Sequence, residues 1–422
     1  MIGNDMVVAL PRATAERVTL FGHNCNRPVG EPRGLERVAG RTFAAGERIR
    51  TPHLSLPQVR NTLTVLAARF AGRWGYSHGV NERGVAAGAS SMKTRLPNDL
   101  PGLTGPDLVR LALERASTAL QGIDVVTDLI SRHGPGVAAS EQDEGDPVII
   151  LADAKEAYLL AACSTYWVVQ EVREVRAQCD VCQLRQDWDR ISPGLADLAI
   201  SRGWWPDDGS KLDFGNALIG EDGLIGSGLR RWGRATVVLE QHNGQLDTSI
   251  VRRLMAELGD AARGAVDAAE PAASFVVSLS PATEIGPIAW WCCGVPGESV
   301  YLPVALDGEL PDSLKPDSTG GCEAWRMAWR LEELSLRDAR TRAAARMLFP
   351  GLQARYDRDA NEYLAEAASL HSRGDTPALH RLASTFMQHA AERFEEACES
   401  LVGGEAAPEA FDAAAMQSPV VS

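Results

Sequence analysis

Cys25 and His23 are the first residues along the chain whose types and spacing could support nucleophilic chemistry. They lie two positions apart, and residues two apart on a β-strand share a face, so a Cys–His pair is geometrically feasible there. The alternative, which we favour, is that Cys25 is a small residue of the core, because a free buried cysteine behaves as a small apolar side chain.

The other cysteines offer a second kind of chemistry. Cys179 and Cys182 have the C-x-x-C spacing of metal and redox sites, and the adjacent pair Cys292 and Cys293 could add ligands. A second C-x-x-C or a regularly spaced histidine pair is missing, so we favour small buried thiols and expect neither a metal nor a cofactor. In a long chain without an export signal, we expect all eight cysteines to be reduced.

Two tryptophan pairs, Trp204-Trp205 and Trp290-Trp291, are candidates for the wall of a ligand pocket. Aromatic pairs serve more often as anchors of a core or an interface, and this is the interpretation that we prefer.

Composition narrows the classes of function. The 422 residues carry a formal net charge of −14, which disfavours nucleic acids and anionic membranes as partners. The start of the chain does not resemble a signal peptide, and no uninterrupted apolar stretch approaches the roughly 20 residues that span a bilayer. We therefore expect a cytoplasmic protein without nucleic-acid or membrane partners.

Alternating apolar runs predict a layered α+β domain over residues 1–310. Strands at 6–11 and 18–23 should form a hairpin, and small residues at 84–89 should let another layer approach a strand closely. Apolar positions at helical spacing predict one helix over 106–133. Further strands are expected at 148–153, 156–162, 166–173, 274–280, 288–294 and 299–306.

Residues 323–402 have the charged, periodic pattern of a helical C-terminal region, and 403–422 reads as a disordered tail. We expect a helix from 323, a second after Pro350, and a third that opens with Thr376 as N-cap and Pro377 at the first helical position. This region should pack on the sheets or on another subunit.

Six segments in order resemble the secernin and cysteine-dipeptidase group of N-terminal-nucleophile (Ntn) hydrolases. They are the start at 4–11, FGHNCNRP at 21–28, WGYSHGVNERGVAAG at 74–88, and the later segments at 151–172, 201–214 and 294–304. The resemblance implies a four-layer αββα sandwich with the reactive residue at the head of the first strand. It also implies hydrolysis of peptide or related amide bonds.

The reactive positions of that group are changed here. Asn4 stands where the group has its catalytic cysteine, and a carboxamide is a poor nucleophile. By the same resemblance, His23 takes the place of a basic residue, and Asn26 that of the aspartate that orients the freed α-amino group. Asp180 falls where relatives have an oxyanion-binding asparagine, and a carboxylate there would repel a developing oxyanion.

Other matched positions survive. Asn81 matches a second oxyanion-type asparagine of the group, and Asn24 and Arg27 match residues of its second-strand signature, which we take as ligand-binding candidates. We therefore expect a catalytically impaired relative that binds a small peptide-like or amide ligand or a partner protein. The alternatives are an active peptidase or amidohydrolase with a rearranged site, which could use Cys25, and a structural subunit of a homo- or hetero-oligomeric assembly.

Overall fold

The computed structural model of the chain describes residues 4–28, 31–96, 101–136, 145–219, 227–262, 269–281 and 285–403. Its strands are β1 (Asp5–Ala9), β2 (Thr19–Pro28), β3 (Arg33–Val38), β4 (Arg48–Arg50), β5 (Ser55–Pro57), β6 (Val65–Phe70), β7 (His78–Asn81), β8 (Ala86–Met92), β9 (Asp146–Ala152), β10 (Ala157–Cys163), β11 (Tyr166–Glu171), β12 (Val175–Gln178), β13 (Arg190–Ile191), β14 (Ala269–Leu279), β15 (Ile288–Cys292) and β16 (Leu302–Ala305). Its α-helices are α1 (Gly105–Arg115), α2 (Ala119–His133), α3 (Leu195–Ser201), α4 (Phe214–Leu218), α5 (Ser227–Gln241), α6 (Thr248–Ala262), α7 (Glu323–Arg337), α8 (Ala339–Ser372) and α9 (Thr376–Val402).

Two antiparallel sheets form the centre of the molecule. The first has the strand order β12-β1-β2-β14-β15-β16, and the second has the order β13-β11-β10-β9-β8-β7-β6-β3. The predicted hairpin of the first two strands is confirmed: β1 pairs with β2 in a register that sets Asp5 opposite Asn24 and Met6 opposite His23. This register fixes which side chains around the head of β1 share a face, because neighbouring residues alternate between faces.

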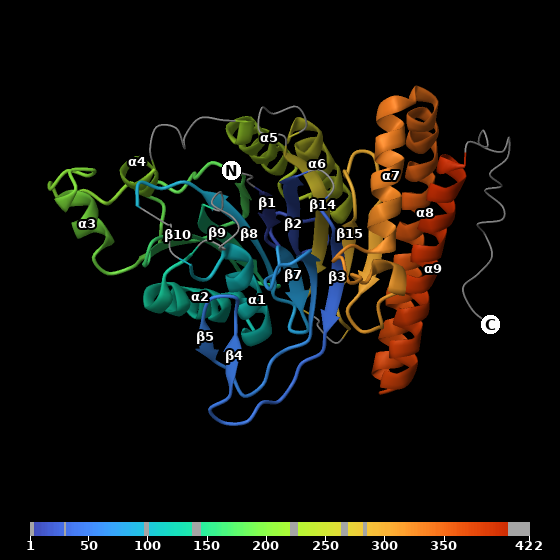
Figure 1. The fold of residues 1–422 in the computed structure, drawn as a ribbon, viewed down its shortest axis with the longest axis horizontal. Helices are drawn as coiled ribbons and strands as arrows, with labels where there is room; N and C mark the ends of the chain where they lie inside the picture. The colour runs from blue at the N-terminus through green and yellow to red at the C-terminus, as the bar shows by residue number, and fades with distance from the viewer. Residues whose placement is uncertain are drawn as a thin grey trace.

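Helices cover the outer faces of both sheets. Helices α1 and α2 pack on the eight-stranded sheet, and α5 and α6 pack on the six-stranded sheet (Figure 1). The two inner faces meet in a core that includes Met6 and Phe21 of one sheet and Val80 and Ile150 of the other. The predicted four-layer αββα sandwich of the α+β class is therefore confirmed.

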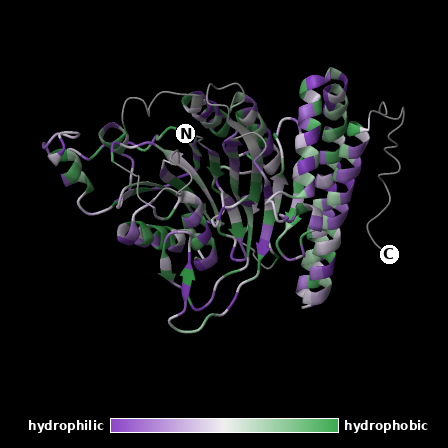
Figure 2. Cartoon of the chain, in the orientation of Figure 1, coloured by the Kyte–Doolittle hydropathy of each residue, from purple (hydrophilic) through white to green (hydrophobic). Residues whose placement is uncertain are grey.

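The helical C-terminal extension lies beside the sandwich, where α8 and α9 contact the edge strand β16 (Figure 1). Figure 2 shows hydrophilic and hydrophobic residues interleaved along these helices. Burial of Phe349, Tyr356, Phe386 and Phe394 joins the extension to the main core. Residues 404–422, for which we predicted a disordered tail, lie outside the described residues.

The predicted helix boundaries in the extension are wrong in two places. Helix α8 starts at Ala339 and runs through Pro350, which lies on its exposed side. A proline inside a helix removes one hydrogen bond, and at a solvent-facing position water can satisfy the freed carbonyl. The N-cap of α9 is Asp375, whose side chain accepts a hydrogen bond from the Ala378 amide, so Thr376 is already helical.

The single helix predicted over 106–133 is two helices. Thr104 caps α1 in a reciprocal capping box with Asp107, and Thr118 caps α2 by accepting a hydrogen bond from the Gln121 amide. Both helices bury an apolar stripe on the same sheet. The apolar residues therefore recur at helical spacing on both sides of the break at 116–118. Periodicity alone therefore did not show the break.

Candidate functional site

Asn4 lies immediately before β1 and is half-buried between the two sheets. Each end of its side-chain amide makes a hydrogen bond: Nδ2 donates to the Ala89 carbonyl at 2.7 Å, and Oδ1 accepts from the Asn26 main-chain amide at 2.9 Å. These bonds fix the carboxamide at the head of the first strand, between β2 and β8. Neither end of this carboxamide can be deprotonated to attack a carbonyl, so Asn4 offers no nucleophile at the head of β1.

Ser90 joins the main chain of Asn4 to the second sheet. Its hydroxyl accepts a hydrogen bond from the Asn4 amide and donates one to the Asn4 carbonyl, both at 3.0 Å. The side chain is almost completely buried. The Ser90 hydroxyl therefore contacts Asn4 directly, but its proton is donated to a backbone carbonyl.

A charged cluster lies on the outer face of the six-stranded sheet beside Asn4. The fully buried Asp5 accepts a hydrogen bond from Arg231 Nε of α5 at 2.9 Å, and Arg231 Nη2 contacts Asp180 Oδ1 at 3.0 Å. Asp5 also accepts from the Asn26 side chain at 3.2 Å and from the Cys179 thiol. One guanidinium thus joins two carboxylates, and α5 is tied to β1 through them.

The two carboxylates keep the Arg231 guanidinium charged. Burial lowers the pKa of Arg231, but the charges of Asp5 and Asp180 outweigh this effect and raise that pKa above its ordinary value. Burial also raises the pKa of Asp5, and Arg231 opposes that rise. The guanidinium therefore stays charged, and Asp180 is held by an ion pair where the sequence suggested a repulsive carboxylate.

His23 lies on the inner face of β2 and faces β8. Its Nε2 lies 3.0 Å from the Ala89 carbonyl, so this nitrogen carries the proton, since a carbonyl can only accept. The ring packs against Gly88, where an added Cβ would approach the His23 ring to 2.4 Å. The prediction that small residues in this strand permit close approach of another layer is thereby confirmed.

His23 and His78 form a buried, uncharged pair. Their ring centroids are 4.6 Å apart, and His78 Nδ1 is 3.0 Å from the Ser77 hydroxyl. Burial lowers the pKa of His23 to about 4, and burial together with His23 lowers the pKa of His78 well below its ordinary value. Both rings are therefore neutral near pH 7, and His23 does not supply the positive charge that the resemblance associates with its position.

This pair makes stability depend on pH. The unfolded chain takes up protons on both histidines as pH falls below about 6.5, while the folded chain does not, so stability is full above that pH and declines toward pH 4. We expect His23 alone to remove about 3 kcal/mol by pH 4. Urea unfolding at several pH values measures the slope. The His23→Gln variant should flatten it and the exposed-site control His242→Gln should not; an unchanged slope in His23→Gln would contradict this assignment.

Cys25 shares the inner face of β2 with His23 and is buried. Burial raises its pKa to about 11, and the Ser77 hydroxyl is its hydrogen-bond neighbour. Within the described residues, the His23 ring directs its hydrogen bond to Ala89 and not to this thiol. A thiol with so high a pKa is almost entirely protonated at pH 7 and is a weak nucleophile.

The other site residues predicted from the sequence lie away from Asn4. Asn81 is on the outer face of β7, where its amide donates to the Leu113 and Ala116 carbonyls at the end of α1. Asn24 donates to the Met255 carbonyl of α6 at 2.7 Å. Arg27 forms an ion pair with Glu31 at 2.6 Å. In this structure Asn26 and Asp180 surround the head of β1 with Asn4, whereas these three residues hold neighbouring elements in place.

Sequence reasoning missed two residues of the site, Arg231 and Ser90. A buried carboxylate at Asp5 needs a cation, which is a usable signal, but several arginines in 230–234 and elsewhere could have supplied it. Nothing in the sequence distinguishes Ser90 from its neighbour Ser91.

The cysteines show no metal or redox arrangement. All eight are free and buried, and in the described ranges no three His, Cys, Asp or Glu side chains are grouped so as to hold a metal ion. Among the described helices, none is both long and apolar enough to cross a bilayer.

Comparison with known proteins gives distant likenesses. No protein-family model matches the chain. Among solved structures, a mutant conjugated bile acid hydrolase from Clostridium perfringens aligns with a TM-score of 0.41 at 11% identity, covering 69% of this chain and 89% of the other. Penicillin V acylase from Agrobacterium tumefaciens aligns at 0.38 and 13% identity, covering 68% and 86%.

A third solved structure, the Caenorhabditis elegans ortholog of N-acylethanolamine-hydrolyzing acid amidase, aligns at 0.33 and 11% identity, covering 64% of this chain and 91% of the other. Similarity at TM-scores this low is too weak to assign a function. The functional assignment therefore depends on the geometry of the chain itself.

Proposed function

We propose that this chain is a secernin-like member of the Ntn-hydrolase superfamily in which the nucleophile position has lost its chemistry. The observation that supports this proposal most directly is the position of the Asn4 carboxamide. It lies at the head of β1 between the two sheets and is hydrogen-bonded at both ends. The αββα layering and the order of matched segments support the superfamily assignment. Acyl transfer needs a thiol or hydroxyl at that position, and Asn4 has neither.

The retained role that we propose is binding of a small peptide-like or amide ligand, or of a partner protein, by a cytoplasmic protein. Beyond its bonds to Ala89 and Asn26, the Asn4 carboxamide has a second N–H hydrogen and a second oxygen lone pair, which suit an amide ligand. The buried charged cluster behind β1 ties α5 to this end of the sheet and so restrains it. Rigid positioning of polar groups favours recognition even where turnover is lost.

The alternative of an active peptidase or amidohydrolase with a rearranged site has one observation in its favour: the Ser90 hydroxyl contacts the Asn4 main chain. Its hydrogen bond to a carbonyl, and the lack of a base bonded to it within the described residues, argue against it. Cys25 is a poorer candidate because burial raises the pKa of its thiol.

A panel of dipeptides tests these proposals. We expect calorimetric titration to detect binding of at least one dipeptide and chromatography to detect no release of free amino acids. Turnover by the wild-type chain that disappears in Ser90→Ala or Cys25→Ala would establish the alternative and sink the proposal. If neither binding nor turnover occurs and the chain forms a defined oligomer, the structural-subunit hypothesis replaces it.

A further inference from the structure

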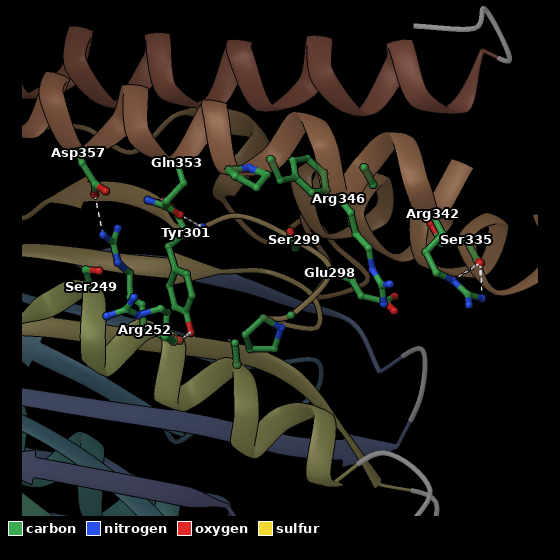
Figure 3. Close-up of a pocket in the computed structure, with 17 residues that line it drawn as sticks. Ser249, Arg252, Glu298, Ser299, Tyr301, Ser335, Arg342, Arg346, Gln353 and Asp357 are labelled. Carbon is green, nitrogen blue, oxygen red and sulfur yellow. Dashed lines mark hydrogen bonds and ion pairs between the residues drawn. The ribbon is translucent and has the colours of Figure 1, made fainter. Parts of the chain in front are cut away.

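A cavity of about 280 Å³ lies where the sandwich meets the helical extension (Figure 3). Its walls come from α6, from the connection between β15 and β16, and from α7 and α8. None of the described residues that hydrogen-bond Asn4 lines it. Its size is close to the lower end of the range for small-molecule sites, roughly 300–1,000 Å³.

The charge around this cavity is opposite to that of the whole chain. Four arginines line it, Arg252, Arg253, Arg342 and Arg346, against the two acidic residues Glu298 and Asp357. Four arginines and two acidic residues give the lining a formal charge of +2, whereas the whole chain has a formal net charge of −14. A positive cavity in an acidic protein attracts small anions over cations.

Arg252 is the best-positioned of these arginines. It is 6% exposed, its guanidinium lies 4.2 Å over the Trp290 ring, and Nη2 contacts Asp357 at 2.7 Å. Its Nη1 is buried without a hydrogen-bond partner in the described residues. A buried guanidinium nitrogen without a partner is costly, and a ligand oxygen would satisfy it.

The other residues that line the cavity determine which further groups a ligand would need. Arg342 is held by two hydrogen bonds from its guanidinium to the Ser335 carbonyl, at 2.9 and 2.6 Å, and Arg346 points toward Glu298 (Figure 3). Ala345 and Phe349 add an apolar wall on the α8 side. An anionic head with a small apolar body fits both parts.

We propose that this cavity binds a small organic anion, an oxyanion group on an apolar body, with Arg252 as its main anchor and Arg253 and Arg346 at the exposed rim. The Trp290 ring under Arg252 and the ion pair with Asp357 fix the plane of the guanidinium, so that Nη1 meets the oxyanion with little further loss of rotamer freedom. The site joins α6 of the sandwich to α8 of the extension, so a bound anion would stabilise the contact between them.

Calorimetric titration of the full chain with benzoate, phenyl phosphate and the neutral isostere benzamide tests this proposal. We expect saturable binding of at least one anion and at least tenfold weaker binding of benzamide. Preference between the two anions distinguishes a carboxylate from a phosphate ligand, and inorganic phosphate alone tests the need for an apolar body.

Variants locate the site. Arg252→Gln should weaken binding of the preferred anion at least tenfold, as should the double change Arg253→Gln with Arg346→Gln, which alters only exposed side chains and serves if Arg252→Gln fails to fold. Arg230→Gln, an exposed change on α5, is the control and should bind normally. The proposal is overturned if neither anion binds, if benzamide binds as well as the anions, or if the double variant binds like wild type.

Discussion

Arg231→Met is expected to lower the free energy of unfolding by about 3–5 kcal/mol, because it leaves the carboxylate of Asp5 buried without its cation. The same change frees Asp180 and releases the contact between α5 and β1. Urea denaturation monitored by circular dichroism gives the change directly.

The neighbouring arginine supplies the control for this prediction. Arg230→Gln alters an exposed residue of the same helix, and we expect a change within about 0.5 kcal/mol. Adding Asp5→Asn to Arg231→Met should recover part of the loss, since it removes the uncompensated charge. Wild-type stability of Arg231→Met would show that Asp5 does not depend on this ion pair.

Asn4→Cys should bring nucleophilic reactivity to the head of β1. We expect the variant, prepared so that position 4 is the first residue, to hydrolyse dipeptides at least about a hundredfold faster than the wild-type chain, since nucleophile loss costs several powers of ten. Full recovery is not expected, because the resemblance sets Asn26 in the place of the orienting aspartate and Asp180 in that of an oxyanion donor. Amino-acid release measured by chromatography follows the reaction.

Asn4→Ala with the same start is the matched control for that variant. It removes the side-chain hydrogen bonds to Ala89 and Asn26 without adding a thiol, so it should remain inactive. Equal rates for the cysteine and alanine variants would show that the surroundings of position 4 no longer accept a peptide, and would limit the proposal to partner binding.

Much of the fold followed from local pattern. Alternation of apolar residues located the β1–β2 hairpin, and small residues marked the strand that lets His23 pack on Gly88. Local pattern did not predict the break near 116–118 or the continuation of α8 through Pro350. Each depends on capping or on solvent exposure, which only the assembled structure decides.

Residues around Asn4 could be brought together from the sequence only where they lie within one segment or a matched motif. Asn4 and Asn26 were paired through the resemblance, and the structure joins them by a hydrogen bond. Arg231 comes from a helix far later in the chain, and Ser90 from a strand of the other sheet, so no local signal connects them to Asn4. Asn81 shows the converse: its motif matches, yet strand alternation turns its side chain to the outer face.

Acylation of the residue at position 4 can be measured directly by mass spectrometry. Wild-type chain incubated with an activated acyl ester such as p-nitrophenyl acetate, then digested and analysed by mass spectrometry, should carry no acyl group on Asn4, Ser90 or Cys25, while the Asn4→Cys variant carries one on its new thiol. A stoichiometric adduct on any of those three wild-type residues, appearing at the rate of turnover, would contradict the account.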